Sequence, residues 1–304
     1  MLTAVDVGLA LPQMTSGLDR TRVLAWCAAI DDGPFSSVSA GERITFDNLD
    51  GFTLCAAAAG LTDRVRVLLN VVVAPWHQPA MLAKQVASID VVSGGRVELA
   101  VGVGGREQDY AALGSPFVGR FGRLDDAVAE VRRLWAGGEA ADGGVVGPAP
   151  VQPDGPRILC SAMGPKSLAR AARWADGVSG FAIDGDPAGV DAGFRRVEQA
   201  WLDAGRTERP RLMTAAFVAL GPGAPDTLRS FGARYLGWMG ELGEKVAARM
   251  PLHDEDALAG FLTAVAATGC DELVLVPADN DPALAGRIAE VVGDAGTAVG
   301  QTDG

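Results

Sequence analysis

The chain has 304 residues, 48% of them hydrophobic, and a formal net charge of −12 at pH 7. This length can bury a large core and allows either two modest domains or one α/β barrel. The excess of acidic residues argues against nucleic acid and against an anionic membrane surface as partners, because both would repel the chain.

The cysteines and the first residues bear on the cellular compartment. The four cysteines lie far apart in apolar or small-residue surroundings, without a CxxC motif, and we expect buried, reduced thiols. The opening residues, MLTAVDVGLALPQ, contain neither a basic stretch nor a long apolar run. No apolar run elsewhere approaches the length of a membrane span. We therefore expect a cytoplasmic protein that has no membrane partner.

Strand-like and helical patterns alternate along the chain. Runs rich in branched aliphatic residues, or bounded by turn residues, predict strands at Val5–Leu11, Phe35–Ser39, Val65–Val73, Val97–Val103, Arg157–Cys160, Val178–Ile183, Leu212–Leu220 and Glu272–Val276. The intervening patterns predict helices at Gly17–Ile30, Leu49–Ala59, Pro79–Val92, Arg120–Trp135, Pro165–Ala175, Pro187–Ala204, Asp226–Met250 with interruptions, and Pro282–Val292.

Eight strands that are each followed by a helix predict a parallel (β/α)8 TIM barrel of the α/β class, formed as a single domain by residues 1–304. The Gly- and Pro-rich segment at about 137–155 is predicted to be a long surface connection. A doubly wound sheet is the alternative. The glycines Gly102, Gly104 and Gly105 follow the fourth strand rather than the first, and they lack the later spacing of a GxGxxG dinucleotide motif.

A helix start after the fifth predicted strand is a candidate anion site. Residues 157–178, RILCSAMGPKSLARAARWADGV, run from a short strand through small residues into Gly164, Pro165 and Lys166. Proline suits the first helical position, and the free N–H groups of a helix start favour phosphate or carboxylate. Lys166 is one of only three lysines in the chain. The same pattern also describes an ordinary strand-to-helix turn without a ligand.

The histidine count limits the chemistry. Only His77 and His253 occur, which excludes a zinc site with several histidines and leaves few options for a Ser-His-Asp triad. We therefore expect no metal centre. In a parallel barrel, ligands bind at the carboxyl ends of the strands, where His77 follows the third predicted strand. Chemistry is therefore expected at Leu9–Gln13, Ser39–Arg43, Asn70–His77, Gly102–Arg106, Ser161–Lys166, Gly180–Asp184 and Pro277–Asn280.

A long composite motif resembles the bacterial luciferase-like monooxygenase superfamily. The segments HQPAMLAKQVASIDVVSGGRVELAVGVG, REQDYAALG and RFGRLDDAVAEVRRLW carry the resemblance within residues 70–135, and GPKSLARAARWADGV continues it in the family's order and approximate spacing. The resemblance extends weakly to both ends of the chain through VGLALPQ and ELVLVP.

The resemblance implies a barrel that binds a flavin or the deazaflavin coenzyme F420 in its mouth, and family members often form homodimers. The third strand end would carry a bulge with a cis non-prolyl bond against the cofactor ring, and the cofactor phosphate would lie at the helix start after the fifth strand. Lys166 and Arg170 would meet a polyglutamate tail or remain solvated. The residues expected to bind the cofactor are Asn70, Val71, Val72, Gly104, Ala162, Met163, Gly164, Pro165, Lys166 and Ser167.

His77 and Glu42 are the candidate catalytic residues. His77 would donate a proton or, alternatively, only shape the turn before the next helix. Glu42 matches the acidic residue after the family's second strand, but relatives often place a histidine next, where this chain has Arg43. This departure disfavours a proton relay through a histidine at that position, and an ion pair of Glu42 with Arg43 or another arginine is the structural alternative.

The leading hypothesis is an oxidoreductase that transfers a hydride between coenzyme F420 and a small organic substrate. The first alternative keeps the barrel but uses reduced FMN and oxygen. The second is a non-catalytic binding protein that retains the cofactor site without turnover. The side chains that would identify the substrate belong to the variable connections at the barrel mouth.

Overall fold

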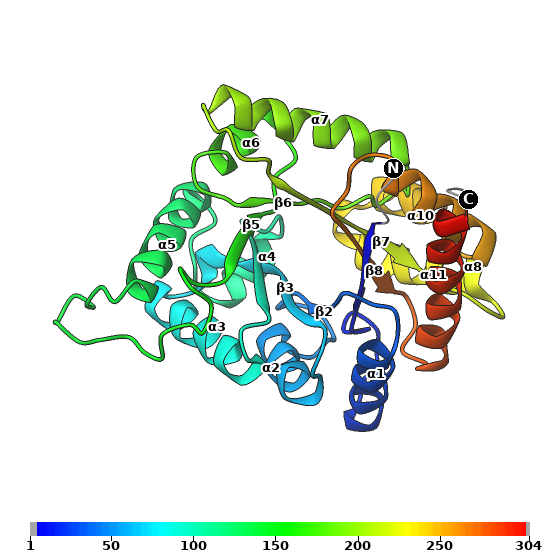
Figure 1. Ribbon diagram of the computed structural model, residues 1–304, viewed down its shortest axis with the longest axis horizontal. Helices are drawn as coiled ribbons and strands as arrows, with labels where there is room; N and C mark the ends of the chain where they lie inside the picture. Colours follow the sequence, from blue (N-terminus) through cyan, green and yellow to red (C-terminus); the bar gives the residue numbers. More distant parts are fainter. Residues whose placement is uncertain (1–4, 302–304) are drawn as a thin grey trace.

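The computed structural model describes residues 5–301 and contains a closed barrel of eight parallel strands (Figure 1). Neighbouring strands pair in chain order, and the last strand pairs with the first. The predicted (β/α)8 architecture is confirmed and the doubly wound alternative is excluded. Of the expected domain 1–304, residues 1–4 and 302–304 lie outside the described residues. The strands are β1 (Asp6–Ala10), β2 (Ser37–Ala40), β3 (Arg66–Val73), β4 (Val97–Gly102), β5 (Arg157–Cys160), β6 (Gly177–Ser179), β7 (Arg211–Val218) and β8 (Glu272–Pro277).

Helices surround the strands on the outside of the barrel (Figure 1). This outer layer contains α1 (Arg20–Asp32), α2 (Gly51–Leu61), α3 (Pro79–Ser93), α5 (Arg120–Trp135), α6 (Pro165–Ala171), α7 (Pro187–Asp203), α10 (Glu255–Ala266) and α11 (Ala283–Gln301). Shorter elements interrupt the connections after β3, β4 and β7. They are the 3-10 helix η1 (Ala74–Trp76), α4 (Glu107–Ala112), α8 (Ala224–Tyr235), the 3-10 helix η2 (Gly237–Met239) and α9 (Glu241–Ala247).

The connection between β7 and β8 differs from the prediction. The predicted helix at Asp226–Met250 is divided into α8, η2 and α9, and the outer layer is completed by α10, which was missed. Helix α10 packs against α7 and α11. Its buried residues Leu258, Phe261, Leu262 and Val265 have helical spacing, and Asp254 accepts a hydrogen bond from Ala257 N at the helix start. The signal for α10 was therefore present in the sequence.

Other boundaries differ by smaller amounts. Strand β6 ends at Ser179 rather than at Ile183, although Gly180 N and Ala182 N still donate to Met213 O and Ala215 O of β7. Helix α11 runs to Gln301, beyond the predicted end at Val292. The segment between α5 and β5 forms the long green loop at the left of Figure 1, with one isolated bridge between Glu139 and Val145. No helix in the described part of the chain is both long and apolar enough to cross a membrane.

Strand alternation divides the core into two layers. Alternate strand residues fill the inside of the barrel, and their neighbours pack between strands and helices. At the amino ends, Glu272 is fully buried and its Oε2 lies 2.7 Å from Arg66 Nη2 and 2.5 Å from Arg211 Nη2. This charged network closes the end opposite the ligand-binding face, which leaves the carboxyl ends for chemistry. The inner layer contains Ala10, Leu68, Ala100, Leu159, Met213, Ala215 and Val274.

Candidate functional site

A cavity of about 480 Å³ opens at the carboxyl ends of the strands. This volume is within the range of small-molecule and cofactor sites. Residues of every strand, or of the connection that follows it, contribute to the wall. They include Gln13 after β1, Ser39 on β2, Asn70 on β3, Gly102 on β4, Ser161 after β5, Ser179 on β6, Phe217 on β7 and Val276 on β8.

A bulge in β3 shapes one side of this cavity. Asn70 pairs with Ala100 and Val72 pairs with Val101, so Val71 is an extra residue between them. The Asn70–Val71 bond is cis, which confirms the predicted bulge and bond. Asn70 and Val71 both line the cavity.

Val72 does not belong to the cavity wall. Its side chain is 1% exposed and packs in the layer between strands and helices. Alternation after the bulge turns this side chain away from the cavity, so the predicted contact of Val72 with the cofactor gains no support from the cavity wall. Val73 lines the cavity instead.

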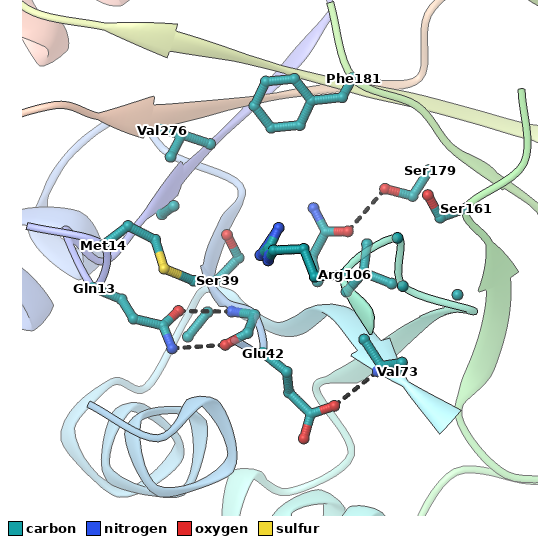
Figure 2. Close-up of a pocket in the computed structure, with 18 of the residues that line it drawn as sticks. Gln13, Met14, Ser39, Glu42, Val73, Arg106, Ser161, Ser179, Phe181 and Val276 are labelled. Atoms are coloured by element: carbon teal, nitrogen blue, oxygen red, sulfur yellow. Dashed lines mark hydrogen bonds between the residues drawn. The ribbon is translucent and has the colours of Figure 1, made fainter. Parts of the chain in front are cut away.

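Gln13 fixes the start of the loop that follows β2. Its Nε2 donates to Gly41 O at 2.6 Å, and Gly41 N donates to its Oε1 at 2.8 Å (Figure 2). Nε2 also donates to Leu49 O at 2.8 Å. Gly41 also has no room for a side chain, because a Cβ there would lie 2.3 Å from Asn70 O. The loop that carries Glu42 is thus held against the bulge of β3.

Glu42 and His77 form a hydrogen-bonded pair at the edge of the cavity. Nε2 of His77 lies 2.8 Å from Glu42 Oε1, and Val73 N donates to Glu42 Oε2 at 2.7 Å. Glu42 contributes to the cavity wall, while its carboxylate is turned toward Val73 (Figure 2). His77 lines a separate outer groove of about 600 Å³ between η1, α3 and α5. The structure therefore brings the two candidate catalytic residues together and places them between two solvent-accessible spaces.

Arg43 does not pair with Glu42, contrary to the structural alternative. Its guanidinium carbon lies 3.7 Å from the centre of the Phe46 ring and 5.0 Å from that of Tyr235, and Nη1 donates to Tyr235 O at 3.0 Å. The side chain is buried, and its Nε has no hydrogen-bond partner in the described part of the chain. Desolvation by burial, followed by the positive charge of Arg106, lowers the pKa of Arg43 to about 10.

Asp109 organises a second group of polar residues. It is 1% exposed and accepts hydrogen bonds from Thr45 N at 2.8 Å and from Arg106 Nε at 3.2 Å. Burial alone would raise its pKa, but the hydrogen bonds from Thr45 and the charge of Arg106 outweigh burial, so the pKa of Asp109 lies below its usual range. Asp109 is thus a stable anion that fixes the position of Arg106.

Small polar groups surround the middle of the cavity. Ser179 Oγ donates to Asn70 Oδ1 at 2.8 Å, and Ser39 and Ser161 face the same space (Figure 2). Gly104 lines this wall as predicted and has a φ of +61°, a conformation that glycine adopts readily. Together with Asn70, these groups offer donors and acceptors to the edge of a planar ring.

The helix start after β5 lies beside this cavity. Helix α6 begins at Pro165 as predicted, and it is short. Gly164 N donates to Ser167 Oγ at 3.1 Å, and the Ser167 hydroxyl donates to Gly164 O at 2.8 Å. Lys166 is exposed, while Arg170 pairs with Asp125. Of the donors expected here, Gly164 N–H, the Ser167 hydroxyl and Arg170 are already engaged within the protein.

Ala162 and Met163 connect this helix start to a second cavity of about 210 Å³ between α6 and α7. Met163 lines both cavities and is 69% exposed. Of the cofactor-binding residues predicted on this side, Ala162 and Met163 therefore line a cavity, while Gly164, Pro165, Lys166 and Ser167 line neither of the two. Their contact with a cofactor stays a prediction.

Several cavity residues were not predicted to have a role. Gln13, Ser39 and Arg106 lie at the strand ends where chemistry was expected, but none of them was assigned a role. Tyr235 could not be found from the strand ends, because it lies at the end of α8 and reaches the cavity only through the fold of the β7–β8 connection.

Comparisons with solved structures agree with this fold. Monooxygenase RslO1 from Streptomyces bottropensis has a TM-score of 0.75 at 20% identity, over 96% of this chain and 98% of that chain. An F420-dependent secondary alcohol dehydrogenase, solved with an F420-acetone adduct, also has a TM-score of 0.75, at 17% identity over 95% of this chain and 98% of that chain. At these identities, the likeness shows the fold alone.

Sequence comparisons identify the family. An uncharacterised protein of Mycobacterium bovis is 36% identical over 190 residues, which are 58% of this chain and 63% of that protein. The match thus spans less than two thirds of the relative's length. The model of the family described as luciferase-like monooxygenase matches residues 3–297. The chain therefore belongs to the luciferase-like monooxygenase family.

Proposed function

We propose that the protein is an oxidoreductase that transfers a hydride between coenzyme F420 and a small organic substrate. The observation that carries this proposal is the bulge of β3, which adds Asn70 and Val71 to the wall of a cavity of about 480 Å³. A planar deazaflavin ring needs a flat contact surface and hydrogen-bond partners along one edge. The Asn70–Val71 segment and the hydroxyl groups of Ser39, Ser161 and Ser179 fit these needs.

The residues of this chain would bind and orient the reactants. When bound, the deazaflavin supplies the hydride chemistry, so the protein contributes position, exclusion of water and proton exchange. The first turn of α6, at Gly164 to Ser167, would hold the cofactor phosphate, although Gly164 N–H would first have to leave Ser167. Ala162 and Met163 would lie along the cofactor between the two cavities.

We propose the Glu42–His77 pair for proton exchange. His77 opens to the outer groove and Glu42 belongs to the cavity wall, with 2.8 Å between Nε2 and Oε1. A proton taken up by His77 from the groove would reach the cavity edge at the Glu42 carboxylate. The pair would thereby balance the proton that accompanies hydride transfer to a carbonyl-like group.

The first test is a pair of tryptophan-fluorescence titrations of the purified protein, one with coenzyme F420 and one with FMN. Trp76 lines the cavity and serves as the internal reporter. The titrations are repeated with Gly164→Asp, which adds a negative charge at the helix start, and with Gly164→Ala as the matched control. A Cβ at Gly164 meets only Ser167 Oγ, at 3.8 Å, so the alanine variant keeps the local structure.

Tight binding of F420, weakened at least tenfold by Gly164→Asp but not by Gly164→Ala, supports the proposal. A preference for FMN supports the second candidate, an FMN-dependent monooxygenase. A monooxygenase is the second candidate because the matching family is that of luciferase-like monooxygenases, and because the monooxygenase RslO1 and the F420-dependent dehydrogenase fit the fold equally well, at a TM-score of 0.75 each. Stoichiometric F420 binding without turnover of any compound in a substrate panel supports a non-catalytic binding protein.

We also propose that the protein is a cytoplasmic homodimer. Leu61 on α2 and Met81, Val91 and Val92 on α3 are apolar and exposed, and the two helices pack against each other. A second copy would remove this apolar surface from water. Sedimentation velocity measures the state directly, and a monomer at micromolar concentration contradicts the proposal.

A further inference from the structure

The guanidinium of Arg106 is held by a hydrogen bond at Nε, while its two terminal nitrogens are available to a ligand. Its Nε donates to the buried carboxylate of Asp109 at 3.2 Å, and its side chain is 13% exposed. Within the described residues, neither terminal nitrogen of Arg106 donates a hydrogen bond to the protein. Figure 2 shows the guanidinium reaching into the cavity toward Met14 and Ser39, away from Ser161. Arg106 thus presents two adjacent N–H donors to whatever occupies that side of the cavity.

The surroundings of Arg106 hold more positive than negative charge. Arg43 and Arg106 both face the ring of Tyr235, at 5.0 and 5.8 Å from its centre. Arg120 also lines the cavity, and its Nε, like that of Arg43, is buried without a partner in the described part of the chain. Two carboxylates belong to this cavity wall in the described part of the chain. Asp109 contacts Arg106 through Oδ2 and Thr45 through Oδ1. Glu42 is hydrogen-bonded to His77 and to Val73 N rather than to an arginine.

This arrangement favours an anion in the cavity. Like charges that gather in a partly buried site repel one another, and the positive charge of Arg106 contributes to the lowered pKa of Arg43. A bound anion relieves this repulsion. The planar fork of an arginine matches the two oxygens of a carboxylate and forms two parallel charge-assisted hydrogen bonds with it.

We propose that Arg106 binds the carboxylate of an anionic substrate, with Arg43 and Arg120 adding positive charge around it. This inference rests on the proposed function, because it takes the cavity to be a substrate site. An oxyanion of the cofactor has the same chemistry. A substrate is the better match, because Arg106 points away from Ser161, the residue that leads toward the helix start assigned to the cofactor phosphate.

The test measures the binding of acetate, benzoate and phenylacetate by tryptophan fluorescence, each against its neutral amide and against sodium chloride at equal ionic strength. The wild-type protein should bind at least one carboxylate saturably and at least tenfold more tightly than its amide. Arg106→Gln should abolish this preference, and Arg106→Lys should weaken carboxylate binding because a lysine lacks the planar fork. Arg120→Gln should weaken carboxylate binding less, because it keeps the Arg106 fork.

Arg195→Gln is the matched control, since Arg195 lies on the exposed surface of α7 and pairs with Asp191 and Glu198. It should bind like the wild type. Equal binding of carboxylates and amides, or no saturable carboxylate binding by the wild type, overturns the proposal. If Arg106→Gln fails to fold, the Arg106→Lys and Arg120→Gln variants decide in its place.

Parallel F420 titrations separate the two sources of an oxyanion. Unchanged F420 affinity in Arg106→Gln, together with lost carboxylate binding, assigns the contact to the substrate. A tenfold loss of F420 affinity with unchanged carboxylate binding assigns Arg106 to the cofactor and overturns the proposal. If F420 fails to bind the wild type, the proposed cofactor is wrong, while the carboxylate titrations still decide the role of Arg106.

Discussion

Glu42 and His77 are 35 residues apart in the chain, and Nε2 of His77 lies 2.8 Å from Glu42 Oε1. The same carboxylate accepts a hydrogen bond from Val73 N at 2.7 Å. The Glu42 side chain therefore joins the loop after β2 to the end of β3 and to the imidazole ring of His77. The pair can act in proton exchange, in fastening the two strands, or in both.

Glu42→Gln separates these two roles. Glutamine can still accept the hydrogen bond from Val73 N, but it cannot hold a proton from His77. With a substrate found by turnover screening, we expect hydride transfer to slow roughly 100-fold and to lose one limb of its pH profile. F420 affinity should change less than about twofold, as measured by fluorescence.

His77→Asn is the companion variant. It should show the same altered pH profile if His77 carries the proton. A lower unfolding free energy in both variants, with wild-type rates and pH profiles, would reduce the pair to a structural role. Stopped-flow absorbance of the coenzyme and urea unfolding give the two readouts.

Gln13→Ala should destabilise the protein and weaken cofactor binding. The change leaves Gly41 N, Gly41 O and Leu49 O without their partner, and an unsatisfied buried group costs about 1–3 kcal/mol. Urea unfolding measures the loss. Gln199→Ala on α7 is the control, because Gln199 pairs only with Asp203 on an exposed surface. Equal effects of the two changes would contradict the positioning role of Gln13.

Glu272 should make the stability of the barrel depend on acid pH. Burial alone would raise its pKa, but Arg66, Ser37, Ser36 and Arg211 together hold it below the usual value of 4.5. A group with a lowered folded pKa contributes its stability above the unfolded pKa. We therefore expect this contribution to be complete above pH 4.5 and to be lost as the pH falls through the lower folded value.

Glu272→Gln tests this expectation. Removing one partner of a buried ion pair costs about 3–5 kcal/mol, so unfolding at pH 7 should require clearly less urea. The variant should also lose part of the acid sensitivity of the wild type. Glu241→Gln, at a side chain that is 90% exposed, is the control and should change stability by less than about 0.5 kcal/mol. An acid transition that is identical in wild type and Glu272→Gln would show that other groups dominate.

The four cysteines should resist alkylation in the native protein. All four are buried free thiols, as predicted, and burial raises the pKa of Cys27 to about 11 and that of Cys55, Cys160 and Cys270 to about 12. Because the thiolate is the reactive form, iodoacetamide at pH 8 should label none of them within an hour or so and all of them in urea. Mass spectrometry counts the labels, and rapid native labelling at any of these positions would contradict the packing.

Local patterns were enough to predict the barrel and the place of its site. Apolar runs of strand length alternated with helical spacing, and a proline after Gly164 marked the start of α6, because these signals depend only on neighbouring residues. The rule that ligands bind at strand carboxyl ends then pointed to the regions around Gln13, Glu42, Asn70 and Arg106. The family resemblance added the bulge in β3.

Tertiary structure decided the contacts. Whether Glu42 meets Arg43 or His77, and whether Val72 or Val73 faces the cavity, depends on how separate strands lie in register after the bulge. The free fork of Arg106 depends on Asp109, Thr45 and a chain fold that brings Tyr235 back over the mouth. Sequence spacing predicts which face a residue takes within its own element. It carries no information on distances between elements, which the packing of the whole barrel fixes.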